Sequence, residues 1–418
     1  MTFRLYYDDS FVSEFSATVL RCHALPAEKG SARFQVTLEQ TAFYPTSGGQ
    51  PHDTGTLGDA NVMDVVESDA GEILHITDAP LPAGPIRGAI DWPRRWDHMQ
   101  QHTGQHLLSA AFVELFGAQT VSFHLGRETS SIDVALPELT ASQGSDAERL
   151  TNSIIFDNRA VKAVYGTEAQ LHAMGIRKAV NAEIARRAGP GGVLRAIEIE
   201  NFDRQPCGGT HVARTGQVGV LLLRKVEKQK QNMRVEFVCG ERAARAARAD
   251  FHTLGEAARL LSCAPAELAE IVAKQSRERN QSRRELQDLQ HRLAVLQAGE
   301  LLEQEGAPPG GAPRWIARRL EGENSAAYLR MLATALAAHA GVVSLLVAES
   351  GAFACAKHSA VPGDLGAAVR RALQAVGGKG GGARDFAQGS LESVSGWQEF
   401  AGRVRTVFDD ASSLRARG

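Results

Sequence analysis

The stretch Gln101-His102-Thr103-Gly104-Gln105-His106-Leu107-Leu108-Ser109 decides how the centre of this chain folds. Apolar residues recur around it with helical spacing, which predicts an amphipathic helix over Arg95 to Phe116. Residues four apart on a helix lie on the same face, so His102 and His106 can reach one ion together. This spacing alone is weak evidence, because surface and core histidines also show it.

A second string, Cys207-Gly208-Gly209-Thr210-His211, follows about a hundred residues later in a Gly-rich turn. Glycine lets the backbone bend tightly, so the Cys207 thiol and the His211 imidazole can face the same point. Three imidazoles and one thiolate make a full set of ligands for a tetrahedral zinc ion. The sequence therefore predicts one Zn²⁺ site with arms from two elements. Its predicted ligands are His102, His106, Cys207 and His211.

The composition narrows the class of protein. The chain has 418 residues, enough for several domains, and a formal net charge of -2, so local basic patches must hold any anionic partner. Five scattered cysteines do not make a disulfide framework and favour a reducing cytoplasm. The N-terminus lacks the pattern of a signal peptide, and no apolar run approaches the ~20 residues of a membrane span. We therefore expect a cytoplasmic protein that does not enter a membrane.

Residues 1–91 are predicted to form a small β-barrel domain. Short alternating runs such as Phe34 to Leu38 and Val62 to Val66 are separated by Gly, Pro and Asp, which is typical of barrel strands. The segment Phe43 to Gly55 is dense in turn residues, and its backbone amides can face a phosphate backbone. A plain Gly-rich hairpin connection is the alternative interpretation of this segment.

Residues 92–248 are predicted to form one α+β domain built on an antiparallel sheet, and both ligand pairs lie in it. Strands are expected near 121–125, 131–135, 193–200, 218–226 and 233–239. The basic segment Arg224 to Lys230, with Arg234, follows the second ligand pair. Two interpretations fit it equally: contact with a phosphate backbone, or a solvated strand edge protected by lysines.

Residues 249–305 are predicted to be a helical hairpin or short coiled coil that supports a homodimer. The spacing there is 3-4-3, but it fails upstream, which argues against a long rod. The residues with this spacing are Leu286, Leu289, Leu293 and Leu296. The Pro/Gly-rich stretch Gly306 to Pro313 then predicts a linker.

Residues 314–418 are predicted to form a small α/β domain with a Gly-rich, cationic loop from Gly377 to Gly389. This loop is neither a P-loop nor a dinucleotide-binding fingerprint, because the required glycine and hydroxyl positions are missing. Its two cations, Lys379 and Arg384, suit it to contact with a phosphodiester.

Taken together, the two ligand strings resemble the editing domain of alanyl-tRNA synthetase and of its free-standing relatives, the AlaX trans-editing proteins. The segment Phe43 to Gly55 resembles the SGGQ-containing element of that family, and Gly377 to Gly389 resembles the Gly-rich signature of the DHHA1 domain. These features cover nearly the whole chain in the same order, and the long form of AlaX fits best. The expected fold is an α+β multidomain protein with a small β-barrel, a zinc-containing editing domain, a helical part and a DHHA1-like domain.

The resemblance implies a zinc-dependent aminoacyl-tRNA hydrolase that removes serine, and glycine as a second substrate, from mischarged tRNA(Ala). A pocket fitted to alanine cannot fully reject glycine or serine, so a second hydrolytic site restores the discrimination. The substrate-binding residues expected are Ser122, His124, Gly208 and Gly209, and the RNA-binding residues expected are Ser47, Gly48, Gly49, Gln50, Lys379 and Arg384. The residues identify no general acid or base beyond the zinc ligands.

Several other activities fit the residues less well. No aminoacylation domain precedes the predicted barrel, so we expect no charging of tRNA. Asp97-His98-Met99 is the nearest string to an Asp-His-His phosphoesterase motif, and Thr103 stands where a zincin protease needs Glu. Four protein ligands usually indicate a structural zinc. The main alternative is therefore a non-catalytic tRNA-binding protein in which zinc only holds the two halves of the domain together. A nuclease acting through the C-terminal domain is the third hypothesis.

Overall fold

In the computed structural model, the N-terminal strands close into a barrel, as their alternating pattern predicts. The structure describes residues 2–28, 31–176, 192–306, 308, 312–322 and 325–416. It divides into two compact units, Met1–Glu256 and Ala257–Gly418. The barrel strands, in hydrogen-bonded order, are β2 (Glu14–Glu28), β3 (Ser31–Leu38), β7 (Ile73–Thr77), β6 (Ala60–Glu67), β5 (Gly55–Leu57) and β8 (Gly84–Ile90). The short elements β1 (Phe3–Arg4), α1 (Leu5–Asp8) and β4 (Gln40–Thr41) accompany it.

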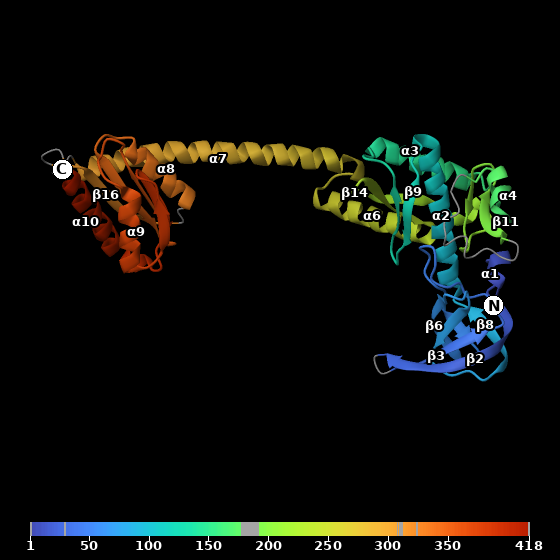
Figure 1. The fold of residues 1–418 in the computed structure, drawn as a ribbon. Helices are drawn as coiled ribbons and strands as arrows, with labels where there is room; N and C mark the ends of the chain where they lie inside the picture. The colour runs from blue at the N-terminus through green and yellow to red at the C-terminus, as the bar shows by residue number, and fades with distance from the viewer. Residues whose placement is uncertain are drawn as a thin grey trace. The chain divides into compact units, whose positions relative to one another are not determined.

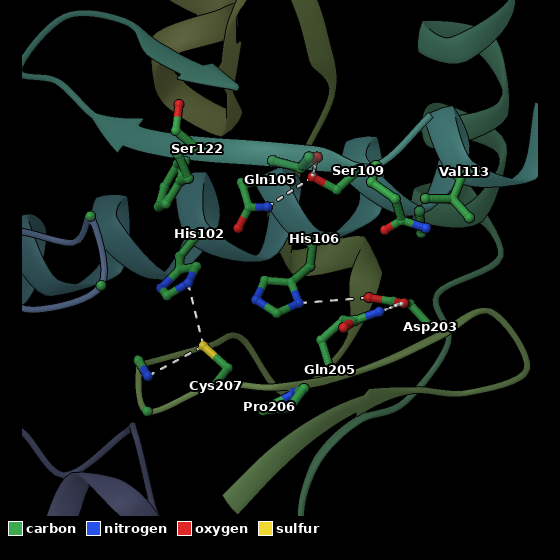
Figure 2. Close-up of a pocket in the computed structure, with 18 of the residues that line it drawn as sticks. His102, Gln105, His106, Ser109, Val113, Ser122, Asp203, Gln205, Pro206 and Cys207 are labelled. Carbon is green, nitrogen blue, oxygen red and sulfur yellow. Dashed lines mark hydrogen bonds and ion pairs between the residues drawn. The ribbon is translucent and has the colours of Figure 1, made fainter. Parts of the chain in front are cut away.

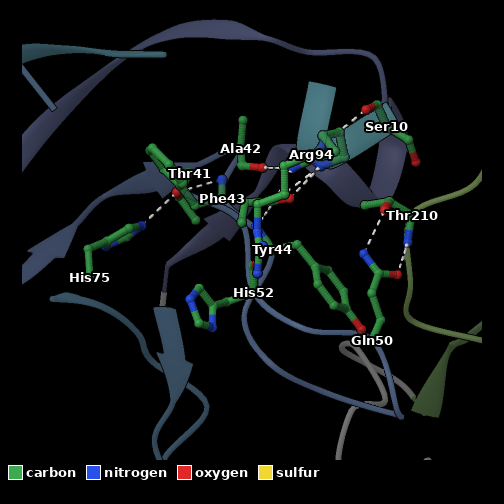
Figure 3. Close-up of polar contacts among 12 residues, drawn as sticks. Ser10, Thr41, Ala42, Phe43, Tyr44, Gln50, His52, His75, Arg94 and Thr210 are labelled. Atoms are coloured by element: carbon green, nitrogen blue, oxygen red, sulfur yellow. Dashed lines mark hydrogen bonds and ion pairs between the residues drawn. The ribbon is translucent and has the colours of Figure 1, made fainter. Parts of the chain in front are cut away.

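The interior of the barrel holds a buried histidine. His75 on β7 is fully buried, its Nε2 lies 2.8 Å from the Thr41 hydroxyl, and its Nδ1 lies 3.2 Å from the Val36 carbonyl oxygen. Figure 3 shows the contact with Thr41. Burial disfavours the charged ring and lowers the pKa of His75 to about 4 from an ordinary value of 6.5.

Acidification is therefore expected to weaken the barrel. Well above pH 6.5, the His75 imidazole is neutral in both the folded and the unfolded chain. As the pH falls towards 4, the imidazole becomes protonated in the unfolded chain but stays largely neutral in the folded chain, which favours unfolding. Because His75 is fully buried, the free energy of unfolding is expected to fall by up to about 3 kcal/mol at pH 4. Urea unfolding at pH 7.5 and at pH 4.5 measures the loss. His75→Gln, which does not titrate, should show a smaller loss than the wild type; an equal loss in both proteins would contradict the assignment to His75.

Helix α2 (Trp92–Phe116) follows the barrel (Figure 1). It carries both predicted histidine ligands, His102 and His106. It begins three residues before the predicted start, because the Asp91 side chain caps it by accepting from the Arg94 amide at 3.3 Å. Gly117, at φ +66°, ends it in the left-handed conformation. A Cβ on Gly104 would lie 2.3 Å from Cys239 Sγ, so this glycine lets α2 approach the neighbouring sheet closely.

The strands after α2 form two sheets, so the prediction of a single antiparallel sheet is wrong. The first, in order β14-β15-β10-β9, comprises β14 (Leu221–Gln229), β15 (Asn232–Cys239), β10 (Ser130–Val134) and β9 (Thr120–Leu125). The second comprises β11 (Val161–Gly166), β12 (Leu194–Ile199) and β13 (Asp203–Pro206). Leu107, Leu108 and Phe112 of α2 pack with apolar residues of β10 and β15 in one core. Helices α3 (Ala141–Phe156) and α4 (Glu168–Ala173) and the turn η2 (Thr215–Val218) complete this region.

The predicted helical region consists of α6 (Gly240–Leu260), the short turn η3 (Pro265–Glu267) and α7 (Leu268–Glu305). Helix α7 is one continuous helix of 38 residues, so the expectation that no long rod would form is wrong. Leu286, Leu289, Leu293 and Leu296 are all more than half exposed on it. Within the described residues, no helix is long and apolar enough to cross a bilayer.

The C-terminal unit is an α/β fold, as predicted, with a sheet in the order β16-β17-β18-β20-β19. Its strands are β16 (Arg314–Leu320), β17 (Val342–Ala348), β18 (Ala352–Lys357), β20 (Phe386–Ser390) and β19 (Lys379–Gly382). The end of α7 and α8 (Ala326–Ala337) cover one face, and α9 (Leu365–Val376) and α10 (Trp397–Ala416) cover the other. The domain therefore begins inside α7, before the predicted boundary at residue 314. Half of the predicted linker at 306–313, residues 307 and 309–311, lies outside the described residues.

The Gly-rich stretch Gly377 to Gly389 is largely a hairpin of β19 and β20, where the sequence predicts a loop. A Cβ on Gly389 would lie 2.1 Å from the Lys379 carbonyl oxygen, and one on Gly380 would lie 2.7 Å from that of Gln388. Glycine is therefore required here for two backbones to pack closely.

Candidate metal centre

The four predicted ligands meet at one point, although their two strings are about a hundred residues apart. Their ligand atoms all lie within 4.8 Å of one another. Cys207 Sγ lies 3.5 Å from His102 Nε2 and 3.3 Å from His211 Nε2. Donors around a tetrahedral zinc, with bonds of about 2.0 to 2.3 Å, are separated by about 3.5 Å. The arrangement thus fits one tetrahedral ion.

Each imidazole of the cluster is held through its other ring nitrogen. His102 Nδ1 lies 2.7 Å from Gln50 Oε1, and His211 Nδ1 lies 3.1 Å from the Thr103 hydroxyl. His106 Nδ1 lies 3.7 Å from a carboxylate oxygen of Asp203, a contact that Figure 2 shows. Histidine ligands of metals are usually oriented through this nitrogen by a carboxylate or another acceptor. The support leaves three Nε2 atoms free to converge, as metal binding requires.

The electrostatics of the cluster favour the form of the thiol that binds metal. Burial opposes ionisation of Cys207, but His102 and His211 outweigh it and hold the pKa of the thiol well below its usual range. Burial and the neighbouring His102 lower the pKa of His211 to about 3, so this ring stays neutral. Burial also disfavours charge on His106, but Asp203 and Cys207 outweigh it and raise its pKa to about 9. A bound cation would therefore displace a proton from His106.

A pocket of about 560 Å³ opens beside the cluster (Figure 2). This volume lies in the usual range for small-molecule sites. Its walls come from the barrel, α2, β9 and the segment before Cys207; they include Tyr7, Tyr44, Gly48, Gly49, Gln105, Ser109, Thr120, Phe123, Asp203 and Gln205. In the part of the chain that the structure describes, the buried Oε1 of Gln205 has no hydrogen-bond partner, while its Nε2 donates to Asp203 at 3.2 Å.

The structure places the two β9 side chains that the sequence predicts to bind substrate at different distances from the pocket. Ser122 borders the pocket, but its hydroxyl donates to Asp133 at 2.6 Å and points away from His102 in Figure 2. The exposed His124 lies on the same strand face and is not part of the pocket wall. Phe123 instead faces the cluster, with its ring stacked 5.4 Å from that of His102. Successive strand residues point to opposite faces, so Ser122 and His124 lie on the face opposite Phe123, and their binding of substrate stays a prediction.

The turn Gly208-Gly209, which the sequence predicts to bind substrate, lines the pocket, and its second glycine has a packing role. A Cβ on Gly209 would lie 2.2 Å from His102 Cε1, so only glycine lets the turn approach this ring. Arg195, which the sequence did not single out, donates to the carbonyl oxygens of Cys207 at 2.7 Å and Gly209 at 3.0 Å. These contacts fix the turn that carries the thiol.

The predicted RNA-binding residues of the barrel form a hairpin turn, the alternative that the sequence left open. Ser47 and Gln50 pair through two backbone hydrogen bonds, and Gly48 and Gly49 between them have positive φ angles. Gly48 and Gly49 border the pocket. Gln50 is fully buried, so its side chain faces the protein interior, while RNA contact through the backbone amides of the turn stays a prediction.

Of the remaining predicted cations, several are engaged within the protein. Arg224 pairs with Asp250, Lys225 with Glu227, and Arg234 with Asp133, which favours the strand-edge interpretation of the basic segment. In the C-terminal unit Lys379 is exposed, and Arg384 Nε lies 3.3 Å from the Gly363 carbonyl oxygen.

Sequence reasoning missed the residues that support the cluster: Gln50 was assigned elsewhere, and Asp203 and Arg195 were not singled out. A carboxylate four residues before Cys207 was the available signal for Asp203. The partners of Gln50 lie 52 and 160 positions away and those of Arg195 lie 12 and 14 positions away, beyond the reach of a local sequence motif.

Comparison with known proteins agrees with this geometry. Residues 194–236, which include Cys207 to His211, match the family model described as "Threonyl and Alanyl tRNA synthetase second additional domain". The chain is 31% identical over 413 residues to an alanine–tRNA ligase of Pyrococcus furiosus, covering 96% of this chain and 43% of the ligase. It is 30% identical over 403 residues to the mouse protein named alanyl-tRNA editing protein Aarsd1, covering 93% of each. The chain thus spans about two-fifths of the ligases it matches and nearly all of the mouse protein.

A solved structure of RecJ from Thermus thermophilus, in complex with Mn²⁺, is 19% identical over 37% of this chain and 20% of that chain. Its TM-score of 0.24 is too low to support an inference about fold.

Proposed function

The chain belongs to the family of free-standing alanyl-tRNA editing proteins, and on that premise we propose that it is a zinc-dependent aminoacyl-tRNA deacylase. Its proposed substrate is tRNA(Ala) mischarged with serine, with glycine as a second amino acid, and it would act in trans without charging tRNA. One observation carries the proposal: three imidazoles and a thiolate converge beside a pocket of about 560 Å³. The free thiol of Cys207 also fits the expected reducing cytoplasm.

The ligand residues suit the hydrolysis of an ester at this position. Zinc, when bound by His102, His106, Cys207 and His211, supplies a Lewis acid that polarises the ester carbonyl or lowers the pKa of a water. The chain's own part is to fix the donors: Thr103 orients His211, and Asp203 orients His106. Phe123 and the ring of His102 stack at the pocket wall and keep that side apolar.

Discrimination of serine from alanine requires a group that binds the serine hydroxyl. Ser122 is the candidate that the sequence predicts; its hydroxyl hydrogen is donated to Asp133, so it could bind the substrate hydroxyl only as an acceptor. As a second candidate we propose Gln205, a residue of the pocket wall whose buried Oε1 has no hydrogen-bond partner among the described residues. A buried acceptor without a partner costs about 1 to 3 kcal/mol, and a substrate hydroxyl would recover it.

Deacylation assays with purified tRNA test this proposal. We expect the wild-type protein to hydrolyse Ser-tRNA(Ala) at least about tenfold faster than Ala-tRNA(Ala), and chelation to stop both reactions. Gln205→Leu should reduce this preference severalfold while zinc content stays unchanged. Equal hydrolysis of the two substrates by the wild type would refute selectivity, and an unchanged preference in Gln205→Leu would refute the assignment of the hydroxyl acceptor.

A non-catalytic tRNA-binding protein with a structural zinc is the second candidate function. The observation that favours it is the complete set of four protein donors, since catalytic zinc sites usually keep one position open. The same assay separates the two: tRNA binding by zinc-loaded protein without any deacylation would support the structural role.

We further propose that the C-terminal unit is DHHA1-like and contacts tRNA through Lys379 and Arg384, and that α7 supports a homodimer. The exposed Lys379 on the Gly-rich edge strand β19 supports the first proposal. The second is supported by the exposed row Leu286, Leu289, Leu293 and Leu296. Filter binding of tRNA to Lys379→Ala tests the RNA contact, and an unchanged tRNA affinity would count against it. Light scattering of Leu289→Lys tests the homodimer, and a molar mass equal to that of the wild type would count against it.

A further inference from the structure

The SGGQ turn of the barrel ends in a side chain that reaches the metal cluster. We infer that Gln50 is a positioning residue for the metal centre: it fixes the ring of His102 and ties the helical pair of ligands to the turn that carries the other pair. This inference rests on the proposed zinc site. It gives the turn a role different from the RNA contact that the sequence predicts for Gln50.

Three hydrogen bonds join Gln50 to both arms of the cluster. Its Oε1 lies 2.7 Å from His102 Nδ1 and 3.2 Å from the Thr210 backbone nitrogen. Its Nε2 donates to the Thr210 hydroxyl at 2.8 Å. Figure 3 shows Gln50 directed at Thr210. His102 lies 52 positions and Thr210 160 positions along the chain from Gln50, so one buried side chain connects three separate segments.

These contacts determine which nitrogen of His102 carries the proton. A backbone N–H can only donate, so the Gln50 atom facing the Thr210 nitrogen must be the carbonyl oxygen. The same oxygen faces His102 Nδ1, which must therefore be the protonated nitrogen. The nitrogen left to bind a metal is then Nε2, the atom that faces Cys207 Sγ. Gln50 thus selects the tautomer that can bind a metal.

The surroundings leave Gln50 and His102 little freedom to rearrange. Phe123 stacks on the ring of His102, and a Cβ on Gly209 would lie 2.9 Å from Gln50 Oε1. The turn itself is anchored on β9, because Leu125 donates its backbone N–H to the Gly49 carbonyl oxygen at 3.1 Å. A Cβ on Gly49 would lie 2.6 Å from the Phe123 carbonyl oxygen, so glycine allows this contact. The barrel turn is thereby a wall of the metal centre.

The effect expected from removing such a partner is large but partial. Loss of a group that orients a metal ligand typically lowers metal affinity about 10- to 100-fold. Gln50→Met keeps the length and bulk of the side chain but removes the acceptor, so we expect zinc affinity to fall within that range. Gln50→Glu keeps an acceptor for both His102 and Thr210, so it should stay within about fivefold of the wild type.

Zinc affinity, measured by competition with a chromophoric chelator on the full chain, tests the inference. Gln40→Met is the matched control, because the Gln40 amide donates to the Ser16 carbonyl oxygen elsewhere in the barrel. It should bind zinc like the wild type. An affinity of Gln50→Met within twofold of the wild type, or Gln50→Glu as weak as Gln50→Met, would overturn the inference while the metal site stands.

A second measurement does not depend on the folding of any variant. Long-range ¹⁵N–¹H spectra of the zinc-loaded wild type should show His102 protonated on Nδ1, and a proton on Nε2 would overturn the inference. A wild-type protein that binds no zinc would remove the proposed centre itself. This outcome differs from a failure of the Gln50 inference, in which the wild type binds zinc and Gln50→Met binds it equally well.

Discussion

Cys207→Ala is expected to abolish detectable deacylation, at least about a 100-fold loss, and to lower the zinc content of the purified protein to a small fraction of the wild type. Cys207 supplies the thiolate of the cluster, and two histidines hold its pKa well below the usual range. Alanine leaves only three imidazoles as donors, and Asp203 still raises the pKa of His106, which favours a proton over a metal on that ring. Both changes weaken the binding of a cation.

The measurements are zinc content by elemental analysis and the initial rate on Ser-tRNA(Ala). Cys263→Ala is the matched control: Cys263 is another half-buried free thiol, in the turn between α6 and α7. It should keep wild-type zinc and rate. Full zinc content and an unchanged rate in Cys207→Ala would disprove the metal centre. Full zinc content with loss of deacylation would instead mean that the thiol acts in catalysis and is not needed to bind the ion.

The features that the sequence predicts well are those encoded by local periodicity. The two-residue alternation predicts the barrel strands, and the 3.6-residue spacing predicts α2 and places His102 and His106 on one face. The second pair, Cys207 and His211, is recognisable because its residue types and spacing suit zinc. The ligand set is therefore readable before any fold is known.

Long-range pairing explains most of what the sequence could not predict. Strand alternation does not identify the partner of a strand, so the strand expected near 193–200, which is β12, was placed in one sheet with β9 and β10, and β11 and β13 were not predicted. A shift of one residue in β9 exchanges the faces of Ser122 and Phe123, and the polar residue was chosen. Gln50 has the composition of an exposed turn residue, and only its buried contact with His102 reveals its role. Polar supporting residues are thus the part of a site that sequence reasoning finds last.

Arg95→Met is expected to lower the free energy of unfolding by about 3 to 5 kcal/mol, the largest stability change foreseen here. Arg95 and Asp53 are both fully buried, and Arg95 Nε lies 3.0 Å from an Asp53 carboxylate oxygen. The guanidinium also donates to the carbonyl oxygens of Ser10 at 2.9 Å and Ala42 at 2.5 Å. Methionine would fill the space but leave the Asp53 carboxylate buried with no cation, and this unpaired charge is the main cost.

Arg94→Met separates that cost from the general effect of changing α2. Arg94 is the neighbouring residue and donates to the His52 carbonyl oxygen at 3.0 Å, but it is only half-buried and faces no buried carboxylate in the described contacts. Its replacement should cost about 1 kcal/mol or less. Urea unfolding of both variants gives the comparison, and equal losses would contradict the dominance of the buried charge.

Adding Asp53→Asn to Arg95→Met should recover part of the lost stability. The amide removes the unpaired charge, and its oxygen still accepts the Tyr44 backbone N–H, which lies 2.6 Å from Asp53. The double variant should therefore lose less than the sum of the single losses, by about 1 kcal/mol or more. Strictly additive losses would mean that the two side chains act independently. Because Asp53 follows Gln50 by three residues and Arg95 precedes His102 by two turns, the same variants should also weaken zinc binding if this pair aligns the turn with the helix.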